Sequence, residues 1–235
     1  RAQRRGSSPK NRVRSHRFPG KSKVPRVEDE VATVAELVHS PVHTAPLARV
    51  RLDNGEQFFI VATEGMGVGQ KVAIGENVAL RPGNITKLSQ IPEGTPVNNI
   101  ESRPGDGGKF ARSGGNSAVV ESNMGDSVRI RLPSGRLKEL HSDCRATIGV
   151  LGGHGRTDKP MMKAGSAHYR AKARGKLYPT VSGVAMNPVD HPHGGGNHQA
   201  VHGPNSVSRH APPGQKVGHI APRRTGRGRT KSKEE

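Results

Sequence analysis

The sequence lacks several residue types on which common functions depend. It has no tryptophan, only 3% aromatic residues and a single cysteine, Cys144. So few rings argue against binding of single-stranded nucleic acid on an aromatic platform. A lone cysteine excludes an internal disulfide and every Cys-x-x-Cys zinc motif. We expect Cys144 to be a small buried residue beside a strand, in a reducing intracellular compartment.

Long apolar runs are absent as well. No stretch approaches the ~20 apolar residues that a membrane span needs, and no basic segment followed by an apolar one marks a signal peptide. We therefore expect a cytoplasmic chain without a membrane partner.

Acidic residues are scarce at both ends of the chain. The formal net charge is +19, from 38 Lys and Arg against 19 Asp and Glu. Residues 1–26 hold ten basic residues and no acid (+10), residues 27–155 hold thirteen and fifteen (−2), and residues 156–235 hold fifteen and four (+11). One short run of like charge is usually a solvated tail. Two long cationic ends on a near-neutral body favour a nucleic-acid partner, which would neutralise them with release of counterions.

Short alternating runs with frequent turn signals predict a mainly β body. Strands are expected in a first unit at 31–38, 47–52, 56–61, 72–74 and 77–80, and in a second unit at 117–121, 128–132, 136–140 and 144–151. Asn54-Gly55 predicts a hairpin with a type I′ turn, in which both central residues have positive φ. Val128, Ile130 and Leu132 share one face, as in a half-buried strand. The first unit is expected to be a small closed or nearly closed barrel.

The expected organisation has four parts. They are a basic N-terminal extension at 1–26, a first β-barrel at 27–91, a second β-barrel with RNA-contacting loops at 92–170, and a basic extended segment at 171–235.

Two loops of the second unit carry basic side chains among glycines. Residues 104–112 include Lys109 and Arg112, without the spacing of a Walker A loop. A purely structural loop and a phosphate contact are both open for this segment. In residues 152–160, Arg156 and Lys159 lie on a flexible loop that leads toward a more basic region, and we expect them to contact RNA.

Basic residues then recur at every second position over residues 168–176. Arg170, Lys172, Arg174 and Lys176 would line one edge of an extended segment or point all around a helix. Either form suits a polyphosphate. A solvated helix is the alternative, but acids for i,i+4 pairing are absent.

The most informative segment is residues 183–199. It holds Asp190, three histidines, two prolines and the glycines 194–196, in a pattern too irregular for a helix or a strand. The glycines permit positive φ and a close approach to the main chain. The prolines stiffen the segment. We interpret it as a rigid loop that contacts a partner.

A metal site or a catalytic pair in this loop is the alternative. The candidate ligands are Asp190, His191, His193, His198 and His202. They lack the i,i+4 spacing of a zincin and a cysteine or second carboxylate to complete a tetrahedral set. Asp190 and His191 also lack a nucleophile in an elbow. We expect no metal, with Asp190 fixing the loop and His191 binding RNA.

Long strings of this sequence resemble one known family. Residues 104–112, 144–150, 155–160 and above all 183–196 are similar to the universal large-subunit ribosomal protein L2 family. Residues 197–199, 211–221 and 223–227 are similar to its archaeal and eukaryotic branch. The resemblance implies an OB-like barrel followed by an SH3-like barrel, with both basic ends threaded into ribosomal RNA. Two positions depart from this branch. His193 is often Phe there, which argues further against a metal site, and Ala200 replaces a common His.

The resemblance also implies a function. The chain would be a structural constituent of the large ribosomal subunit and a primary binder of its rRNA, with neighbouring ribosomal proteins as further partners. It would support subunit association, tRNA binding and the peptidyl transferase region, toward which the 190–196 loop would point. Asp190 and His191 match positions once proposed to act in catalysis, but RNA supplies the active site. We therefore expect no enzyme, no small-molecule substrate, no cofactor, and Mg²⁺ only as rRNA-associated ions.

The predicted RNA-binding residues are basic side chains of the ends and loops, together with the 187–196 segment. They are Arg4, Arg5, Arg12, Arg14, Arg17, Lys109, Arg112, Arg156, Lys159, Lys163, Arg170, Lys172, Arg174, Lys176, Asn187, Asp190, His191, His193, Gly194, Gly195, Gly196, Arg209, Arg223, Arg224 and Arg227. Two other functions remain as alternatives. One is an enzyme that uses Asp190 and His191 for acyl transfer or hydrolysis, and the other is a free-standing DNA-compacting protein.

Overall fold

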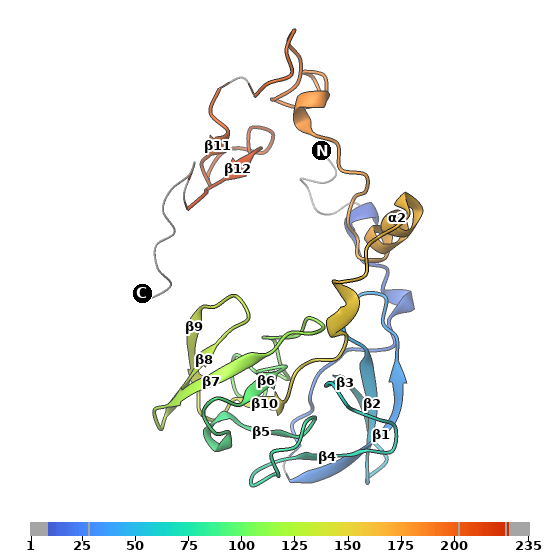
Figure 1. Cartoon of the computed structure of the whole chain (residues 1–235), viewed down its shortest axis with the longest axis vertical. Coiled ribbons are helices and arrows are strands. Elements are labelled where there is room, and N and C mark those ends of the chain that lie inside the picture. The colour runs from blue at the N-terminus through green and yellow to red at the C-terminus, as the bar shows by residue number, and fades with distance from the viewer. Residues whose placement is uncertain (1–8, 28, 202, 224, 226–235) are drawn as a thin grey trace. The chain divides into compact units, whose positions relative to one another are not determined.

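The computed structural model describes residues 9–27, 29–201, 203–223 and 225. The chain divides into two compact units, which are described separately. Ser15–Pro160 form the first, here called the β body, and Arg1–Arg14 with Met161–Glu235 form the second, here called the cationic unit. Figure 1 shows the strands of the β body and, in the cationic unit, a helix followed by irregular segments.

The β body contains ten strands and three short 3-10 helices among its described residues. The strands are β1 (Glu30–Val38), β2 (Leu47–Leu52), β3 (Gln57–Val61), β4 (Lys71–Ile74), β5 (Ile85–Lys87), β6 (Pro96–Asn98), β7 (Ala118–Asn123), β8 (Ser127–Arg131), β9 (Leu137–His141) and β10 (Arg145–Ile148). The 3-10 helices are η2 (Ser15–Arg17), η3 (Leu88–Gln90) and η4 (His154–Arg156). The strands form one sheet in the order β3-β2-β1-β4-β5-β10-β6-β7-β8-β9.

Over its described residues, the β body contains two large hydrophobic cores and one smaller cluster, made of Ala45, Leu47, Val61 and Leu151. The first is built from β1 to β5 and includes the fully buried Val34 and Val50. The second is built from η3 and β6 to β10 and includes Val128, Ile130 and Cys144, with Leu132 packed against it. The predicted shared face of the 128–132 run and the predicted burial of the cysteine are therefore confirmed. Burial also raises the pKa of the Cys144 thiol to about 11.

The two cores are joined by a strand from the end of the β body. Arg145–Ile148, which is β10, pairs antiparallel with β5 on one side and with β6 on the other. The predicted mainly β class is confirmed, and an OB-like part followed by an SH3-like part is consistent with the two cores. Sequence analysis predicted two separate barrels, whereas in the structure the strands of both parts belong to one sheet.

The hairpin at Asn54-Gly55 is confirmed, but its predicted turn type is wrong. Gly55 has φ +89°, whereas Asn54 has no positive φ. The Gly55 N–H donates to the Leu52 carbonyl (3.0 Å), and the Leu52 N–H donates to the Glu56 carbonyl (2.9 Å). These bonds define a three-residue loop that ends in a glycine bulge instead of a two-residue type I′ turn. The β8–β9 hairpin repeats the pattern with Gly135, at φ +79°.

In the β body, one expected strand is absent and two observed strands were not expected. Residues 77–80 form no strand, because Asn77 has φ +54° and the Ala79 carbonyl accepts from the Asn84 side chain (2.9 Å) instead of from a neighbouring strand. The strands β5 and β6 are only three residues long each. Runs this short carry no readable alternation.

The cationic unit is mostly irregular, as expected for the C-terminal segment. Its described elements are η1 (Pro9–Asn11), α2 (Ala164–Ala173), η5 (Gly183–Ala185), and the two-residue parallel strands β11 (Ser206–Val207) and β12 (His219–Ile220). Of the two forms open for residues 168–176, the structure has the helix, up to Ala173. Helix α2 also runs across the predicted boundary between 170 and 171. Within the described ranges, no helix has the length and apolar character to cross a membrane.

Candidate nucleic-acid interface

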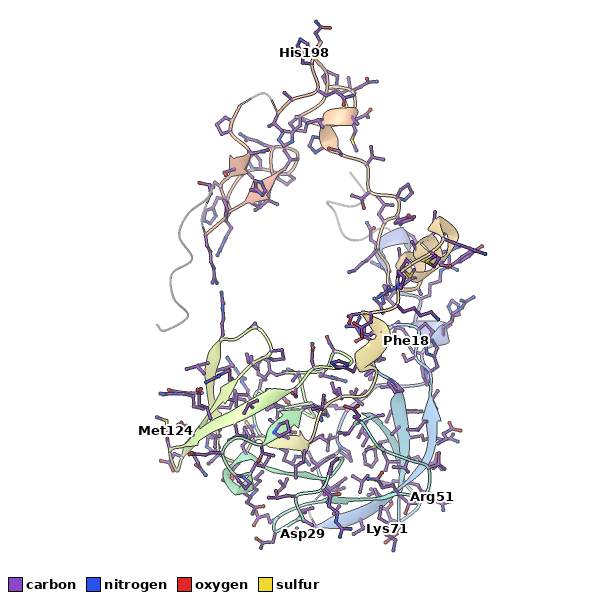
Figure 2. The ribbon with its side chains drawn as sticks, in the orientation of Figure 1. Phe18, Asp29, Arg51, Lys71, Met124 and His198 are labelled. Atoms are coloured by element: carbon purple, nitrogen blue, oxygen red, sulfur yellow. The ribbon has the colours of Figure 1, made fainter. Side chains whose placement is uncertain are left out.

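Several charged side chains on the strands of the β body pair with one another. On its strands, Arg49 pairs with Glu36 (3.0 Å) and Arg129 pairs with Glu139 (2.8 Å). Arg131 pairs with Glu121. Such pairs leave little net potential to attract a polyanion to these strands. Other basic side chains, such as those of Arg51 and Lys71, point outward (Figure 2).

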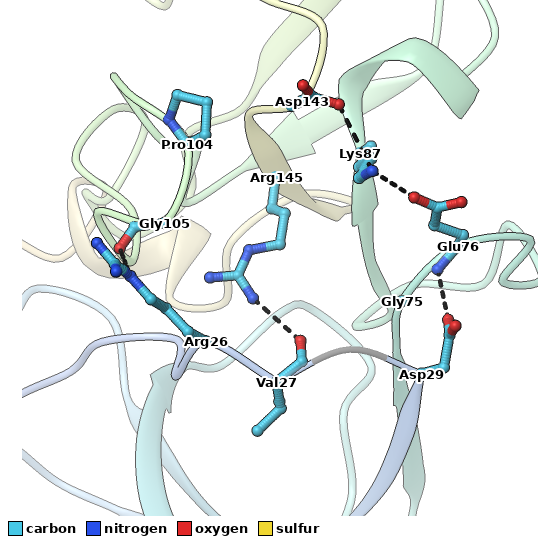
Figure 3. Close-up of a pocket in the computed structure, with 10 residues that line it drawn as sticks. All are labelled: Arg26, Val27, Asp29, Gly75, Glu76, Lys87, Pro104, Gly105, Asp143 and Arg145. Carbon is cyan, nitrogen blue, oxygen red and sulfur yellow. Dashed lines mark hydrogen bonds and ion pairs between the residues drawn. The ribbon is translucent and has the colours of Figure 1, made fainter.

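Charged side chains at the junction between the two cores also pair with one another. A cavity of about 610 Å³ lies there, with Lys87 placed between Glu76 and Asp143 (Figure 3). Its hydrogen bond with Glu76 raises the pKa of Lys87. Across the cavity, Arg26 donates to the Gly105 carbonyl (3.3 Å). The cations here stabilise the junction.

Glu101 forms a buried anchor below the glycine-rich loop. Its side chain is 1% exposed and accepts from the N–H groups of Gly105 (3.1 Å), Gly107 (2.9 Å) and Arg145 (3.0 Å), and from the Arg145 guanidinium (3.0 Å). Burial alone would raise the pKa of Glu101, but these hydrogen bonds and the positive charge hold it below its usual value. Arg145 also donates to the Pro25 carbonyl (2.8 Å), which ties the segment before β1 to the second core.

Asp106 organises the same loop from its surface side. It accepts hydrogen bonds from the Ser102 hydroxyl (2.6 Å) and the Gly108 N–H (3.1 Å), and it pairs with Lys109 (3.1 Å). Burial opposes ionisation, but these partners lower the pKa of Asp106 to about 2. The chain's own carboxylates thus use the N–H groups that a phosphate would need. The structure favours the structural reading of residues 104–112.

The two basic residues predicted in this loop differ in their surroundings. The exposed Lys109 has Asp106 as its partner. Arg112 is half-buried and donates to the carbonyls of Gly108 (3.0 Å) and Ser22 (2.8 Å). Its guanidinium therefore holds the segment before β1, at Ser22, against the loop. RNA contact by either side chain stays a prediction.

The described cationic unit is built from segments that are almost free of acid. Residues 159–189 and 191–223 contain no Asp or Glu, and neither do residues 9–14. Helix α2 has no acid in its first turn, ends with Arg170 and Lys172 in its last turn, and buries no side chain. A helix that is polar all around gains little from packing, so its basic surface is available to a ligand.

A cavity in this unit is lined by the N-terminal segment together with α2 and the residues that follow it. It measures about 380 Å³ and is called the arm pocket here. Its lining includes Arg12 and Arg14 from the N-terminal segment and His168, Lys172, Lys176, Leu177 and Tyr178 from α2 and the residues after it. No acidic residue is part of this lining.

The end of α2 explains how the arm pocket forms. Gly175 has φ +63°, the Gly175 N–H donates to the Lys172 carbonyl (3.3 Å), and the Lys176 N–H donates to the Ala171 carbonyl (2.9 Å). This is a Schellman ending, which needs a residue that tolerates the left-handed region. A Cβ on Gly175 would also lie 2.8 Å from the Asn11 carbonyl oxygen. Glycine thus turns the chain and lets the N-terminal segment pack against it.

Residues 183–199, here called the histidine loop, are held in shape by hydrogen bonds of their own backbone. The N–H groups of Asp190 (3.0 Å) and His191 (3.2 Å) donate to the Asn187 carbonyl, and that of Gly195 donates to the Met186 carbonyl (3.1 Å). A Cβ on Gly194 would lie 2.4 Å from the Met186 oxygen. This glycine is therefore required by the fold of the loop itself. Positive φ, as the glycine run predicted, occurs at the next two glycines, Gly195 (+81°) and Gly196 (+95°).

The ring of His191 is packed inside this loop. It lies over Gly183, where an added Cβ would be 2.3 Å from the ring. Its Nδ1 accepts a hydrogen bond from the His193 N–H (3.0 Å), and the two rings meet edge to face at 4.9 Å. Because Nδ1 accepts, the neutral ring carries its proton on Nε2. His198 lies exposed farther along the loop (Figure 2).

Over the described ranges, no three His, Cys, Asp or Glu side chains form a group that could hold a metal ion. The fifth candidate ligand, His202, lies outside those ranges, as do the predicted Arg4, Arg5, Arg224 and Arg227.

Most of the other predicted side chains are at the surface. Exposed residues are Arg12, Arg14, Arg17, Lys159, Lys163, Arg170, Lys172, Lys176, Asn187, Asp190, Arg209 and Arg223, whereas Arg156, Arg174, His191 and His193 are partly buried. The structure brings four of them, Arg12, Arg14, Lys172 and Lys176, into the arm pocket. Sequence reasoning missed His168, Leu177 and Tyr178 as their neighbours. Gly175 was the available signal, since a glycine after a basic helical run marks a chain reversal.

Comparison with protein families gives two matches that together cover most of the chain. A model described as Ribosomal Proteins L2, RNA binding N-terminal domain, matches residues 2–74. A model described as Ribosomal Proteins L2, C-terminal domain, matches residues 81–216.

Similar curated proteins come from archaea. The chain is 50% identical over 230 residues to the large ribosomal subunit protein uL2 of Methanococcoides burtonii, covering 96% of this chain and 97% of that protein. It is 49% identical over 230 residues to uL2 of Haloarcula marismortui, with 96% of each chain covered. It is 52% identical over 217 residues to uL2 of Ignicoccus hospitalis, covering 92% and 86%.

Proposed function

The chain belongs to the ribosomal protein L2 family, and from that premise we propose that its cationic unit binds large-subunit rRNA while the β body supplies a fixed shape. Its role is structural, as a constituent of the large ribosomal subunit in the cytoplasm, and it is not a classical enzyme. The proposal concerns how the chain binds and what it supports there.

The separation of charge carries this proposal. Arginine, lysine and carboxylate side chains of the β body pair with one another, whereas the cationic unit is nearly free of acid. Phosphates converging between packed RNA helices need such a counter-charge. A structured surface on the β body lets the protein distinguish RNA shapes, since A-form helices are read mostly by shape and backbone.

The finer roles follow from the histidine loop. We propose that residues 187–196 contact RNA near the peptidyl transferase region and that the chain supports subunit association and tRNA binding without reacting. Support comes from the exposed side chains of Asn187 and Asp190 and from the internally bonded backbone, which would position them with little ordering cost. Neighbouring ribosomal proteins would be further partners, and Mg²⁺ would be present only with the rRNA.

The test compares ligands of similar charge. The full chain is titrated with an archaeal large-subunit rRNA transcript and with duplex DNA of equal length, at several salt concentrations. We expect tighter binding to the rRNA at every salt concentration, with log K falling by about 0.7–0.9 per phosphate contact for each unit of log salt. Equal affinity for the two ligands would replace the ribosomal proposal with a DNA-compacting function.

A second experiment separates contact from catalysis. The change His191→Ala is introduced and the variant is assembled into large subunits. If the variant loses subunit assembly or tRNA binding and also loses peptide-bond formation, His191 has a contact role. Normal assembly with abolished chemistry would favour the enzymatic alternative.

A further inference from the structure

We propose that the arm pocket is a receptor for a single unpaired nucleotide of the RNA, with its phosphates held by the basic side chains and its base placed against Tyr178. This inference rests on the proposed rRNA binding and names the RNA element that the site takes.

The dimensions of the site favour one nucleotide. The arm pocket has a volume of about 380 Å³, at the lower end of the ~300–1,000 Å³ that is typical of small-ligand sites. A duplex presents a convex backbone with its bases stacked inside and would meet only the rim. An unstacked nucleotide, by contrast, can enter with its base and sugar.

The chemistry of the lining matches both parts of a nucleotide. Arg12 and Arg14 face the site from one segment and Lys172 and Lys176 from another, and the segments that supply them contain no acid. A phosphodiester would therefore meet cations on two sides without competition from a carboxylate of the lining. Guanidinium groups add planar, bidentate contacts that lysine alone does not give.

The apolar part of the lining suits a base. Tyr178 is 38% exposed and Leu177 is 45% exposed, although both are large residues that prefer burial. Unpaired bases in RNA are commonly held on Tyr or His rings and read along their edges. His168 lies in the same lining, and Tyr169 packs edge-on against its ring at 5.5 Å. A flat ring, a hydroxyl and an imidazole are thus available beside the cations.

The site is preformed by backbone features instead of by the ligand. The Schellman ending at Gly175 returns the chain beside Lys172, and the close approach of Gly175 to Asn11 holds the N-terminal segment in place. A preformed receptor loses less conformational entropy on binding than a free basic tail does. We therefore expect the arm pocket to add specificity beyond charge attraction.

The test uses the full chain and an archaeal large-subunit rRNA transcript as the probe. Tyr178→Leu should weaken binding about 5- to 150-fold, because stacking of one base is lost, and should leave the salt dependence unchanged. Tyr178→Phe keeps the ring and should bind within about threefold of the unchanged chain. Tyr169→Leu is the matched control, since Tyr169 is 70% exposed on α2 and is not part of the pocket lining.

A footprint supplies the second readout. Acylation of RNA 2′-hydroxyls should show one unpaired nucleotide whose reactivity changes on binding of the unchanged chain and of Tyr178→Phe, but not of Tyr178→Leu. Lys172→Gln should reduce the slope of log K against log salt by about 0.7, as for one lost contact to a single strand. Circular dichroism of each variant checks that the fold is retained.

The outcomes separate this inference from the proposed function. If the unchanged chain does not prefer rRNA to duplex DNA, the proposed function fails. If that preference holds but Tyr178→Leu binds as tightly as Tyr169→Leu, the nucleotide receptor alone is refuted. A Tyr178→Leu change that weakens duplex RNA and rRNA equally would also refute it, because a duplex offers no unstacked base.

Discussion

Replacement of Glu101 by Gln should cost the β body about 3–5 kcal/mol of folding free energy, the range for breaking a buried ion pair from one side. Glu101 is 1% exposed, and each of its oxygens accepts from two donors: Oε1 from the Gly107 N–H and the Arg145 guanidinium, Oε2 from the Gly105 and Arg145 N–H groups. A glutamine keeps one oxygen and turns an NH₂ group toward two donors. It therefore leaves those donors unpaired and a guanidinium without its counter-charge, each costly when buried.

The measurement is urea unfolding of the full chain at pH 7, followed by far-ultraviolet circular dichroism and analysed by linear extrapolation. The control is Glu139→Gln, which removes the partner of Arg129 in an ion pair whose Glu139 side chain is 57% exposed. We expect that change to cost at most about 1 kcal/mol. The reasoning fails if the two variants lose the same stability. Adding Arg145→Met to Glu101→Gln should restore part of the loss, because no buried charge is then left alone.

Three further predictions concern the loops. Since the pKa of Asp106 is about 2 in the folded chain and 3.8 in a free side chain, its ionised form contributes about 2 kcal/mol that is present above pH ~4 and lost as the pH falls toward 2. Asp106→Asn should therefore flatten the urea-derived stability profile in this window, and an unchanged profile would contradict the assignment. Gly183→Ala should displace the ring of His191, seen as changed imidazole shifts in NMR spectra, whereas Gly165→Ala, at an open position of α2, should leave them unchanged. Arg112→Gln should lower stability by about 1–3 kcal/mol through two lost backbone contacts; a loss of RNA affinity at unchanged stability would show a purely external role.

Local patterns of the sequence predicted the β body well where they were long enough to read. The 128–132 run alternates over five residues, and its burial follows the alternation because one face packs on the second core. The hairpin at Gly55 was found for the right reason, a glycine that accepts positive φ. Its turn type was not predicted correctly, because an Asn-Gly dipeptide fits both a two-residue loop and a three-residue loop with a bulge. Which one forms depends on the register of the flanking strands.

Features that join distant segments could not be predicted in this way. The carboxylate of Glu101 meets Arg145, which is 44 residues away, and residues around it gave no sign that it would be buried. The arm pocket likewise needs Asn11 beside Gly175. Basic spacing alone placed Lys172 and Lys176 on a polyanion-binding segment but could not show that Arg12 and Arg14 would face them. Sequence reasoning thus identified which residues carry charge, and the backbone decided which of them act together.

The glycine-rich loops show why a motif must be read with its neighbours. Residues 104–112 and 183–196 both combine several glycines with polar side chains, as phosphate-binding loops do. In the first, the N–H groups of Gly105, Gly107 and Gly108 donate to Glu101 and Asp106, so these backbone donors serve the fold. In the second, the backbone donors bond to carbonyls, and the polar side chains of Asn187 and Asp190 remain exposed. In the first loop, the backbone N–H groups donate to carboxylates, and these bonds stabilise the β body. In the second loop, backbone N–H groups donate to carbonyls of the loop itself, and the exposed side chains stay available for the proposed contact with RNA.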